Sequence, residues 1–374
     1  MAGSGLVAGG NSGTGRIGLV IAGLGGVGSS VIAGILAARA HLVHPFGSLA
    51  EGGGAASTGT FLPLRGQAPL AELGDFALGA FEIRDDDAYR AALRANLVSR
   101  SLLDELRPEL RKVRAMSGAR QAPTRRHLAD ALAEDLRGFL AHHHCARGVL
   151  VCTLPGPAAA SPRTGFSGGD VLAALDEGAD WITPGVVYAA AAAQAGFSFV
   201  AAGRDHSLSA PGIADLFAER GLPIAGAGLL GPDAFLREAL ANLIAAEGLQ
   251  LTGTASLSTR AEEHGARLWG GPDRTSEMAL GCGWAGAPFE VSLELRGQVA
   301  LYLAARAVDA SLLVDLAARA GRAGAQEWMG ALFAASLSNR TPREAAAPLT
   351  LAERRARLLS ELPALARSAA REAA

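Results

Sequence analysis

Residues 17–39, IGLVIAGLGGVGSSVIAGILAAR, place a short apolar run, a glycine-rich loop and a helix-forming stretch in immediate succession. The run from Ile17 to Ala22 is typical of a parallel strand that is buried on both faces. The segment is long and apolar enough to resemble a membrane-spanning helix, but the glycines and serines in its middle disfavour that alternative. It therefore predicts a buried strand, a tight turn and a helix.

The glycines Gly23-x-Gly25-x-x-Gly28 follow the predicted strand and precede the helix, which is the context of a dinucleotide-binding fingerprint. Such glycines let the backbone approach a pyrophosphate, and the helix N-terminus offers free N–H groups and partial positive charge. The alternative is a tight turn that binds nothing. The predicted cofactor-binding residues of this loop are Gly23, Gly25, Gly26, Val27, Gly28 and Ser29.

An acidic side chain that would contact the adenosine ribose is missing where it is usually found. The next candidate strand, HLVHP, offers His41 and His44, and Glu51 follows in a loop. This absence weakens a simple dehydrogenase interpretation.

Alternation of strands and helices predicts an α/β fold with a Rossmann-like, doubly wound parallel sheet. Further buried strands are expected at GVLVCTLPGP (148–157) and FSFVAAG (197–203). QLTGTASLS (250–258) and FEVSLELRG (289–297) alternate apolar and polar residues, which indicates strands with one exposed face. We therefore expect a flexible N-terminus (1–15), a dinucleotide-binding domain (16–198 plus 300–374) and a substrate or oligomerisation domain (199–299).

Composition narrows the class of protein. The chain has 374 residues, of which 49% are hydrophobic and 19% charged, with a formal net charge of −2. Without a basic block, a nucleic-acid partner is not expected. The three cysteines, Cys145, Cys152 and Cys282, have no disulfide or zinc spacing, and residues 1–15 lack the features of a signal peptide. We expect a cytoplasmic protein with no membrane partner and no metal.

The sequence LGDFALGAFEIRDDDAYRAALRANLVSRSLLDELRPELRKVRAMSGA (73–119) follows the glycine loop, and the two together resemble the myo-inositol-1-phosphate synthase family. Gly79-Ala80-Phe81-Glu82-Ile83 is similar to a Gly-Gly-Trp-Asp-Ile segment of that family, so the resemblance implies that Glu82 lies near the cofactor. ITPGVVYAAAAAQAGFSFVAAG, APGIADLFAERGLPIAGAG and LQLTGTASLS also match the family's spacing. The resemblance implies bound NAD (or NADP), a second α+β domain like that of glyceraldehyde-phosphate dehydrogenase, inserted before the C-terminal helices, and a homo-oligomer, either a dimer or a tetramer.

The resemblance fails at the residues that carry the family's chemistry. That family oxidises glucose 6-phosphate, closes the ring and reduces the product, with lysines moving protons and neutralising the phosphate. Its motif G-D-D-F-K-S-G-Q-T-K-x-K falls on residues 226–237, where the lysines become Leu230, Phe235 and Arg237. A later family lysine becomes Ala335, and Lys112 is the one lysine of the whole chain. Leucine cannot transfer a proton and arginine is a poor base, so we predict no inositol phosphate synthesis from glucose 6-phosphate.

Other side chains could support a different reaction. Arg204, Asp205 and His206 replace a polar substrate loop of the family and could bind an anion and move a proton, although a solvated loop explains them equally well. Asp233, as a substrate contact, and Arg237 and His264, as catalytic groups, fall on positions that match family active-site positions, although His264 also suits an exposed helix.

Two classes of function stay open. The first is a diverged NAD(P)-dependent enzyme, an oxidoreductase or isomerase, acting on a small polar or anionic metabolite. The second is a non-catalytic protein that keeps the fold for cofactor binding, structure or assembly, and it predicts a collapsed or apolar pocket at Leu229 and Leu230. Retention of the glycine loop favours the enzyme, but the sequence does not name its substrate.

Overall fold

A parallel sheet forms the body of the protein. The computed structural model describes residues 15–52, 54–56, 59–61, 63–157, 167–259, 273–335, 337 and 349–372. Within them, the largest sheet has seven strands. In spatial order these are β12 (Gly324–Ala325), β8 (Pro223–Gly226), β7 (Phe197–Ala201), β6 (Arg147–Cys152), β1 (Ile17–Ala22), β4 (Phe76–Glu82) and β5 (Ala115–Ser117). The order places β1 between β6 and β4, where the direction of winding reverses, and this confirms the expected doubly wound α/β fold.

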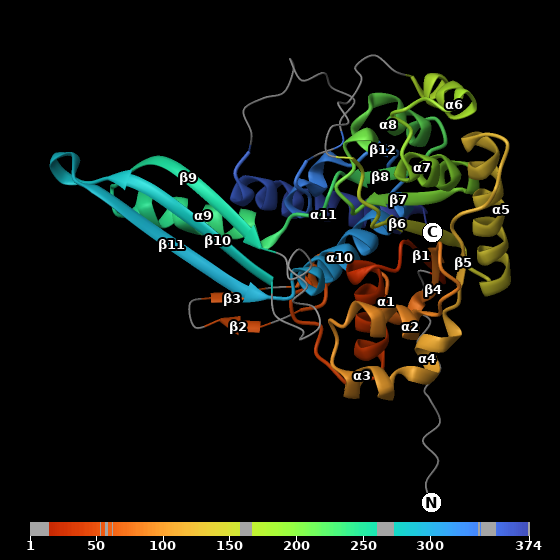
Figure 1. The fold of residues 1–374 in the computed structure, drawn as a ribbon, viewed down its shortest axis with the longest axis horizontal. Coiled ribbons are helices and arrows are strands. Elements are labelled where there is room, and N and C mark those ends of the chain that lie inside the picture. The colour runs from red at the N-terminus through yellow and green to blue at the C-terminus, as the bar shows by residue number, and fades with distance from the viewer. Residues whose placement is uncertain are drawn as a thin grey trace, which may run out of the picture.

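Helices cover both faces of this sheet (Figure 1). One face packs against α1 (Gly26–Arg39), α2 (Ala88–Ala95), α4 (Arg107–Lys112), α10 (Val299–Arg319) and α11 (Leu351–Glu372). The other packs against α5 (Arg125–His143), α6 (Gly168–Glu177), α7 (Pro184–Ala195) and α8 (Pro211–Ala218). Leu19 and Ile21 belong to the first core and Val20 and Ala22 to the second. Burial of alternate residues in different cores explains why β1 is apolar without a break.

The remaining elements are short connections. A helix, α3 (Arg100–Glu105), precedes α4, and two strands, β2 (Gly54–Ala56) and β3 (Gly59–Phe61), pair antiparallel after α1. In the described part of the chain, the 3₁₀ helices are Leu64–Gly66, Leu73–Asp75, His206–Ser209, Trp284–Gly286 and Glu327–Leu332. HLVHP, a candidate strand on its sequence, forms a turn; the strand beside β1 is β4, more than thirty residues later.

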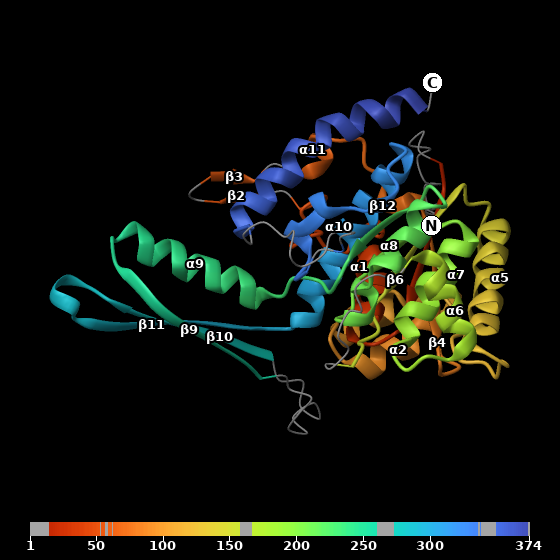
Figure 2. The same ribbon diagram turned by 90° about the horizontal axis from the view of Figure 1, so that it is seen from above.

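A three-stranded antiparallel sheet and α9 (Pro232–Ala246) extend away from this body (Figures 1 and 2). Its strands are β9 (Gln250–Thr259), β10 (Asp273–Cys282) and β11 (Pro288–Gly297). Leu240 and Ile244 of α9 pack on Ala279 of β10 in a small separate core. The second, α+β unit expected from the resemblance is therefore present.

The pairing of strands differs from the expected division at residue 199. That boundary falls inside β7, and both β7 and β8 pair in the parallel sheet. The sequence does not reveal this because β8 is only four residues long and ends in glycine. We propose that the second unit spans Pro232–Gly297. Among the described residues, no helix is both long enough and apolar enough to cross a membrane.

Candidate functional site

The carboxyl ends of β1, β4, β6 and β7 meet at one edge of the parallel sheet. Register pairs Ala22 with Phe81 of β4 and with Cys152 of β6, so the residues that follow these strands are neighbours. The strand order reverses at β1, and open α/β sheets bind ligands at such a point, outside the carboxyl ends of the strands. The candidate site is built here.

The glycine loop has a conformation that other residues would not adopt. Gly23 has φ +97°, and a Cβ on Gly28 would lie 2.1 Å from the carbonyl oxygen of Gly23. Both positions therefore require glycine for the turn itself. Gly25 differs, because a Cβ there would meet nothing within 4 Å. The backbone at Gly25 is thus open to an approaching group.

The N-terminus of α1 has no acidic or capping side chain of its own. Gly25 is the N-cap, makes no side-chain cap hydrogen bond, and no acidic residue stands in the first turn. Ser29 is buried, and its hydroxyl donates to the carbonyl of Gly25 (2.8 Å), so that hydrogen is not directed at a ligand. Free N–H groups and the helix dipole suit a diphosphate, so these residues fit a dinucleotide.

Glu82 lies at the end of β4, beside the glycine loop. Its Oε2 accepts from the backbone N–H of Leu24 (2.9 Å) and its Oε1 from that of Ile83 (2.9 Å). Each carboxylate oxygen can accept a second hydrogen bond, so two acceptors remain for ribose hydroxyls. A carboxylate therefore lies beside the glycine loop, on a strand that directly neighbours β1, and we propose that it takes the place of the acidic residue missing after HLVHP.

Thr153 is a structural residue of the loop that sequence reasoning missed. Its hydroxyl lies 3.1 Å from the carbonyl oxygen of Ala22 and 2.9 Å from that of Gly23, and it donates to this pair. It therefore fixes the path of the chain as it leaves β1. A threonine directly after a buried strand was the available signal.

Cys152, the last residue of β6, and Tyr188 of α7 are buried in the second core. Burial raises the pKa of the Cys152 thiol to about 12, with a smaller contribution from the charge of Asp205. Burial also raises the pKa of Tyr188, whose hydroxyl donates to the carbonyl of Gly118 (3.3 Å). A fully buried thiol that stays protonated at neutral pH is not a nucleophile, as expected for a small core residue.

The three polar residues after β7 differ in burial. Asp205 is 1% exposed and accepts hydrogen bonds from the Thr183 hydroxyl (2.5 Å) and the backbone N–H of Ser207 (3.0 Å). It thereby ties its loop to the N-cap of α7. Arg204 and His206 are exposed on either side of it. The structure thus separates a buried positioning carboxylate from two accessible side chains.

Asp233 and Arg237 lie together on the first turns of α9, in the second unit. The Arg237 guanidinium donates to the hydroxyl of Ser256 (2.8 Å) and pairs with the buried carboxylate of Glu277 (3.4 Å). It lies 4.0 Å from Asp233. Sequence reasoning missed Glu277, whose strand β10 was not predicted. His264 lies outside the described residues.

The segment between β8 and α9 is held by its backbone. Gly228 and Leu229 donate to the carbonyls of Ala201 and Ala202 (2.9 Å each), and Leu230 donates to that of Leu332 (2.8 Å). The side chain of Leu229 is 3% exposed and belongs to the main core. Leu229 therefore contributes to the packing of the core.

Comparison with known proteins agrees with this architecture. An NAD-binding family model described as myo-inositol-1-phosphate synthase matches residues 17–345. The chain belongs to the myo-inositol-1-phosphate synthase family. NAD is accordingly its cofactor.

Similar proteins are found among curated sequences and solved structures. Inositol-3-phosphate synthase 1 of Bacteroides thetaiotaomicron is 25% identical over 385 residues, covering 84% of this chain and 88% of that protein. Inositol-3-phosphate synthase of Caenorhabditis elegans has a TM-score of 0.78 at 14% identity, with 94% of this chain and 86% of that chain covered. A myo-inositol-1-phosphate synthase-related protein from Thermotoga maritima has a TM-score of 0.66 at 16% identity (92% and 97%). These two structural likenesses establish the fold.

Proposed function

We propose that this family member uses NAD in a redox or redox-triggered step on a small polar or anionic metabolite, and that it does not cyclise glucose 6-phosphate. One contrast carries the proposal. The open N-terminus of α1, with Glu82 beside it, suits a dinucleotide, whereas the segment 226–237 contains no lysine and directs Leu229 into the core.

Each residue has a distinct proposed role. The N–H groups of residues 25–28 would hold the diphosphate, and Glu82 would accept hydrogen bonds from ribose hydroxyls. When bound, NAD supplies a hydride acceptor, or a donor in its reduced form. Arg204 would neutralise an anionic substrate, and His206 would exchange a proton with it, because both are exposed at the carboxyl edge. Asp205 would position this loop rather than react.

The second unit has a less direct role in this proposal. Arg237 and Asp233 would contact the substrate from α9, but the pairing of Arg237 with Glu277 gives that arginine a structural task as well. His264 stays a proposed catalytic group. We further propose a cytoplasmic homo-oligomer, a dimer or a tetramer, as the amino-acid composition and the family resemblance suggest.

The test is a substrate screen on the NAD-loaded protein. Sugar phosphates, polyols and hydroxy acids, with glucose 6-phosphate among them, are incubated with the enzyme, and NADH and products are followed by absorbance and mass spectrometry. We expect turnover of at least one compound and no inositol phosphate from glucose 6-phosphate. Formation of inositol phosphate would overturn the second half of the proposal.

Variants of the exposed pair sharpen the assay. Arg204→Gln should raise KM about tenfold or more for an anionic substrate, because a charge-assisted contact is lost. His206→Asn should lower kcat about a hundredfold. Arg137→Gln, on an exposed part of α5, is the matched control and should change neither constant. If Arg204→Gln behaves like this control, its assigned role is wrong.

A non-catalytic role is the second candidate, and one observation favours it. Backbone hydrogen bonds and the buried Leu229 occupy the segment where the family resemblance places its lysines. This candidate predicts NAD bound in near-stoichiometric amount, released on denaturation, with an NAD to NADH ratio that no compound of the screen changes.

A further inference from the structure

The second unit is joined to the body at the carboxyl edge of the parallel sheet. On the entering side, a Cβ on Gly228 would lie 3.1 Å from Arg204 Cγ. On the leaving side, α10 begins two residues after β11 ends, and a Cβ on Gly26 of the glycine loop would lie 3.4 Å from the Cβ of Ala300 in α10. Both connections therefore lie beside residues of the candidate site. A rotation of the second unit about them would move Arg237 relative to the glycine loop.

Glu238 of α9 caps the first turn of α11. Its Oε2 accepts from the backbone N–H of Leu351 (2.8 Å) and its Oε1 from that of Ala352 (2.9 Å), so α9 and the start of α11 lie side by side (Figures 1 and 2). The next N–H, that of Glu353, donates to the hydroxyl of Thr350 (3.2 Å). The first N–H groups of a helix have no partner within the helix, and the helix dipole favours a negative charge beside them. Glu238 therefore binds α11 through two hydrogen bonds and through its charge.

Asp273, at the start of β10, caps α10 in a similar way. Its Oδ2 accepts from the backbone N–H of Val299 (3.0 Å), the first residue of the helix. The N-cap of α10 is Gln298, which makes no side-chain cap hydrogen bond, and the first turn contains no acidic residue. A carboxylate from the second unit thus supplies the cap that the helix lacks.

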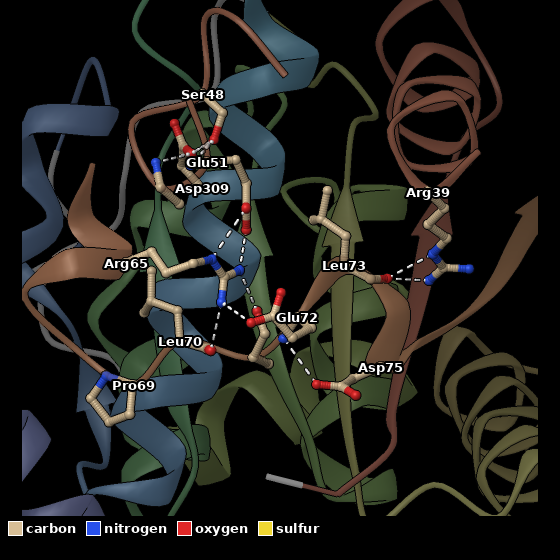
Figure 3. Close-up of polar contacts among 12 residues, drawn as sticks. Arg39, Ser48, Glu51, Arg65, Pro69, Leu70, Glu72, Leu73, Asp75 and Asp309 are labelled. Carbon is tan, nitrogen blue, oxygen red and sulfur yellow. Dashed lines mark hydrogen bonds and ion pairs between the residues drawn. The ribbon is translucent and has the colours of Figure 1, made fainter. Parts of the chain in front are cut away.

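The helix α10 is itself fixed in the body. Asp309 accepts from the Ser48 hydroxyl (2.6 Å) and from the backbone N–H groups of Leu49 (2.8 Å) and Ala50 (3.0 Å); Figure 3 shows the contact between Ser48 and Asp309. The helix is also buried without a break from Ala307 to Ala317. Because α10 cannot follow the second unit, a movement of that unit must break the contact with Asp273.

Other contacts hold the second unit together internally. Leu240 and Ile244 of α9 pack on Ala279 of β10, and Arg237 pairs with Glu277. None of these contacts involves the body. Loss of the two caps should therefore let the unit turn as a whole without unfolding it.

We propose that Glu238 and Asp273 are positioning residues that fix the orientation of the second unit against the body. Through this orientation they set the distance between the glycine loop and Arg237, the neighbour of Glu238 on α9. The part played by Arg237 rests on the function proposed above, whereas the fixed orientation is a property of the fold alone. When both caps are removed, the second unit turns about its two connections and Arg237 no longer has one position at the carboxyl edge.

Double electron–electron resonance tests the orientation without any turnover. The chain supplies its own positions for spin labels, because Cys145 of the body and Cys282 of the second unit are partly exposed while Cys152 is buried. Labelled protein is diluted with unlabelled protein, so that only distances within one chain are recorded. We expect one narrow distance distribution for the NAD-loaded protein. The distribution should become about twofold broader or more when Glu238→Ala and Asp273→Ala are combined.

Further variants separate the orientation from a general loss of structure. Asp273→Asn should keep the narrow distribution, because asparagine caps a helix about as well as aspartate does. Glu290→Ala removes an exposed carboxylate of β11 and should also leave the distribution unchanged. The melting temperature of the double variant should fall by only a few degrees, because both changes lie at helix termini. If it falls further, the single variants Glu238→Ala and Asp273→Ala replace it, and each should broaden the distribution.

An unchanged distribution in these alanine variants, or an equally broad one in Glu290→Ala, would overturn the proposal. Turnover supplies a second readout. For a substrate found in the screen, Glu238→Ala should lower kcat about tenfold and leave the Kd for NAD within about twofold, since the cofactor loop is intact. A screen without turnover contradicts the proposed function, and the distance measurement still decides whether the two carboxylates fix the second unit.

Discussion

The loop after β1 and the segment after β8 both follow the carboxyl end of a strand in one sheet, yet the first leaves a helix N-terminus uncovered and the second covers it with a carboxylate. Each leaves the carboxyl end of a buried strand and begins a helix at a glycine N-cap. The first turn of α1 has no acidic residue, whereas that of α9 has Asp233. A Cβ on Gly231 would lie 2.4 Å from Asp233 Oδ1, so this carboxylate covers the start of α9.

The difference shows which properties depend on backbone and which on side chains. Binding of a diphosphate at α1 needs glycines that permit one backbone path, and any helix that follows provides the N–H groups. At α9, the helix dipole is already balanced by Asp233, and the segment before it is hydrogen-bonded to its neighbours. A site of that kind needs specific side chains for its chemistry, and leucine supplies none.

The largest expected effect comes from Gly28→Ala. Its methyl group would be forced against the carbonyl oxygen of Gly23, so the turn must open and the fold lose about 3 kcal/mol or more. We expect NAD affinity to fall at least a hundredfold, measured by calorimetry, together with a lower melting temperature.

Gly25→Ala is its matched partner. The added methyl meets no protein atom, so the melting temperature of the NAD-free protein should stay within a few degrees. NAD affinity should still fall about tenfold, because the methyl occupies the open side of the loop. Unchanged affinity in Gly25→Ala would mean that the diphosphate does not approach there.

A change of intermediate size is expected at α9, where Arg237 pairs with Glu277. Arg237→Ala leaves the fully buried carboxylate of Glu277 without the guanidinium, which should cost about 1–2 kcal/mol in urea unfolding. Adding Glu277→Gln should recover most of that loss. If Arg237 acts only in catalysis, the single variant keeps its stability and loses turnover.

The sequence predicted those parts of the fold that have strong local signals. The glycine loop and the strand before it were recognisable because glycines and a run of apolar residues are needed wherever this turn occurs. The strand β10 was missed, although it pairs with both β9 and β11. Its sequence, DRTSEMALGC, contains charged and small residues, and its place is set by pairing with distant strands.

The site was predictable to a smaller extent. Glu82 was found by resemblance, but its place beside β1 depends on the excursion between α1 and β4, which displaces the acidic residue along the chain. Arg204, Asp205 and His206 are consecutive in sequence, and their different burial could not be read from composition. Asp205 is directed inward by Thr183 at the start of α7, more than twenty residues before it.

Glu82→Gln has the smallest expected effect and separates electrostatics from shape. A carboxylate at this position accepts ribose hydroxyls and repels a 2′-phosphate, so the unmodified protein should prefer NAD to NADP. Glutamine keeps one acceptor oxygen but removes the charge, and we expect NAD to bind about fivefold more weakly. NADP should bind equally or better, so the preference for NAD over NADP narrows about fivefold or more in parallel titrations. Because Glu82 also accepts from Leu24, a small loss of stability is expected, and melting curves measured without cofactor isolate it. If the preference for NAD over NADP does not change, Glu82 only holds the glycine loop in place and does not contact the ribose.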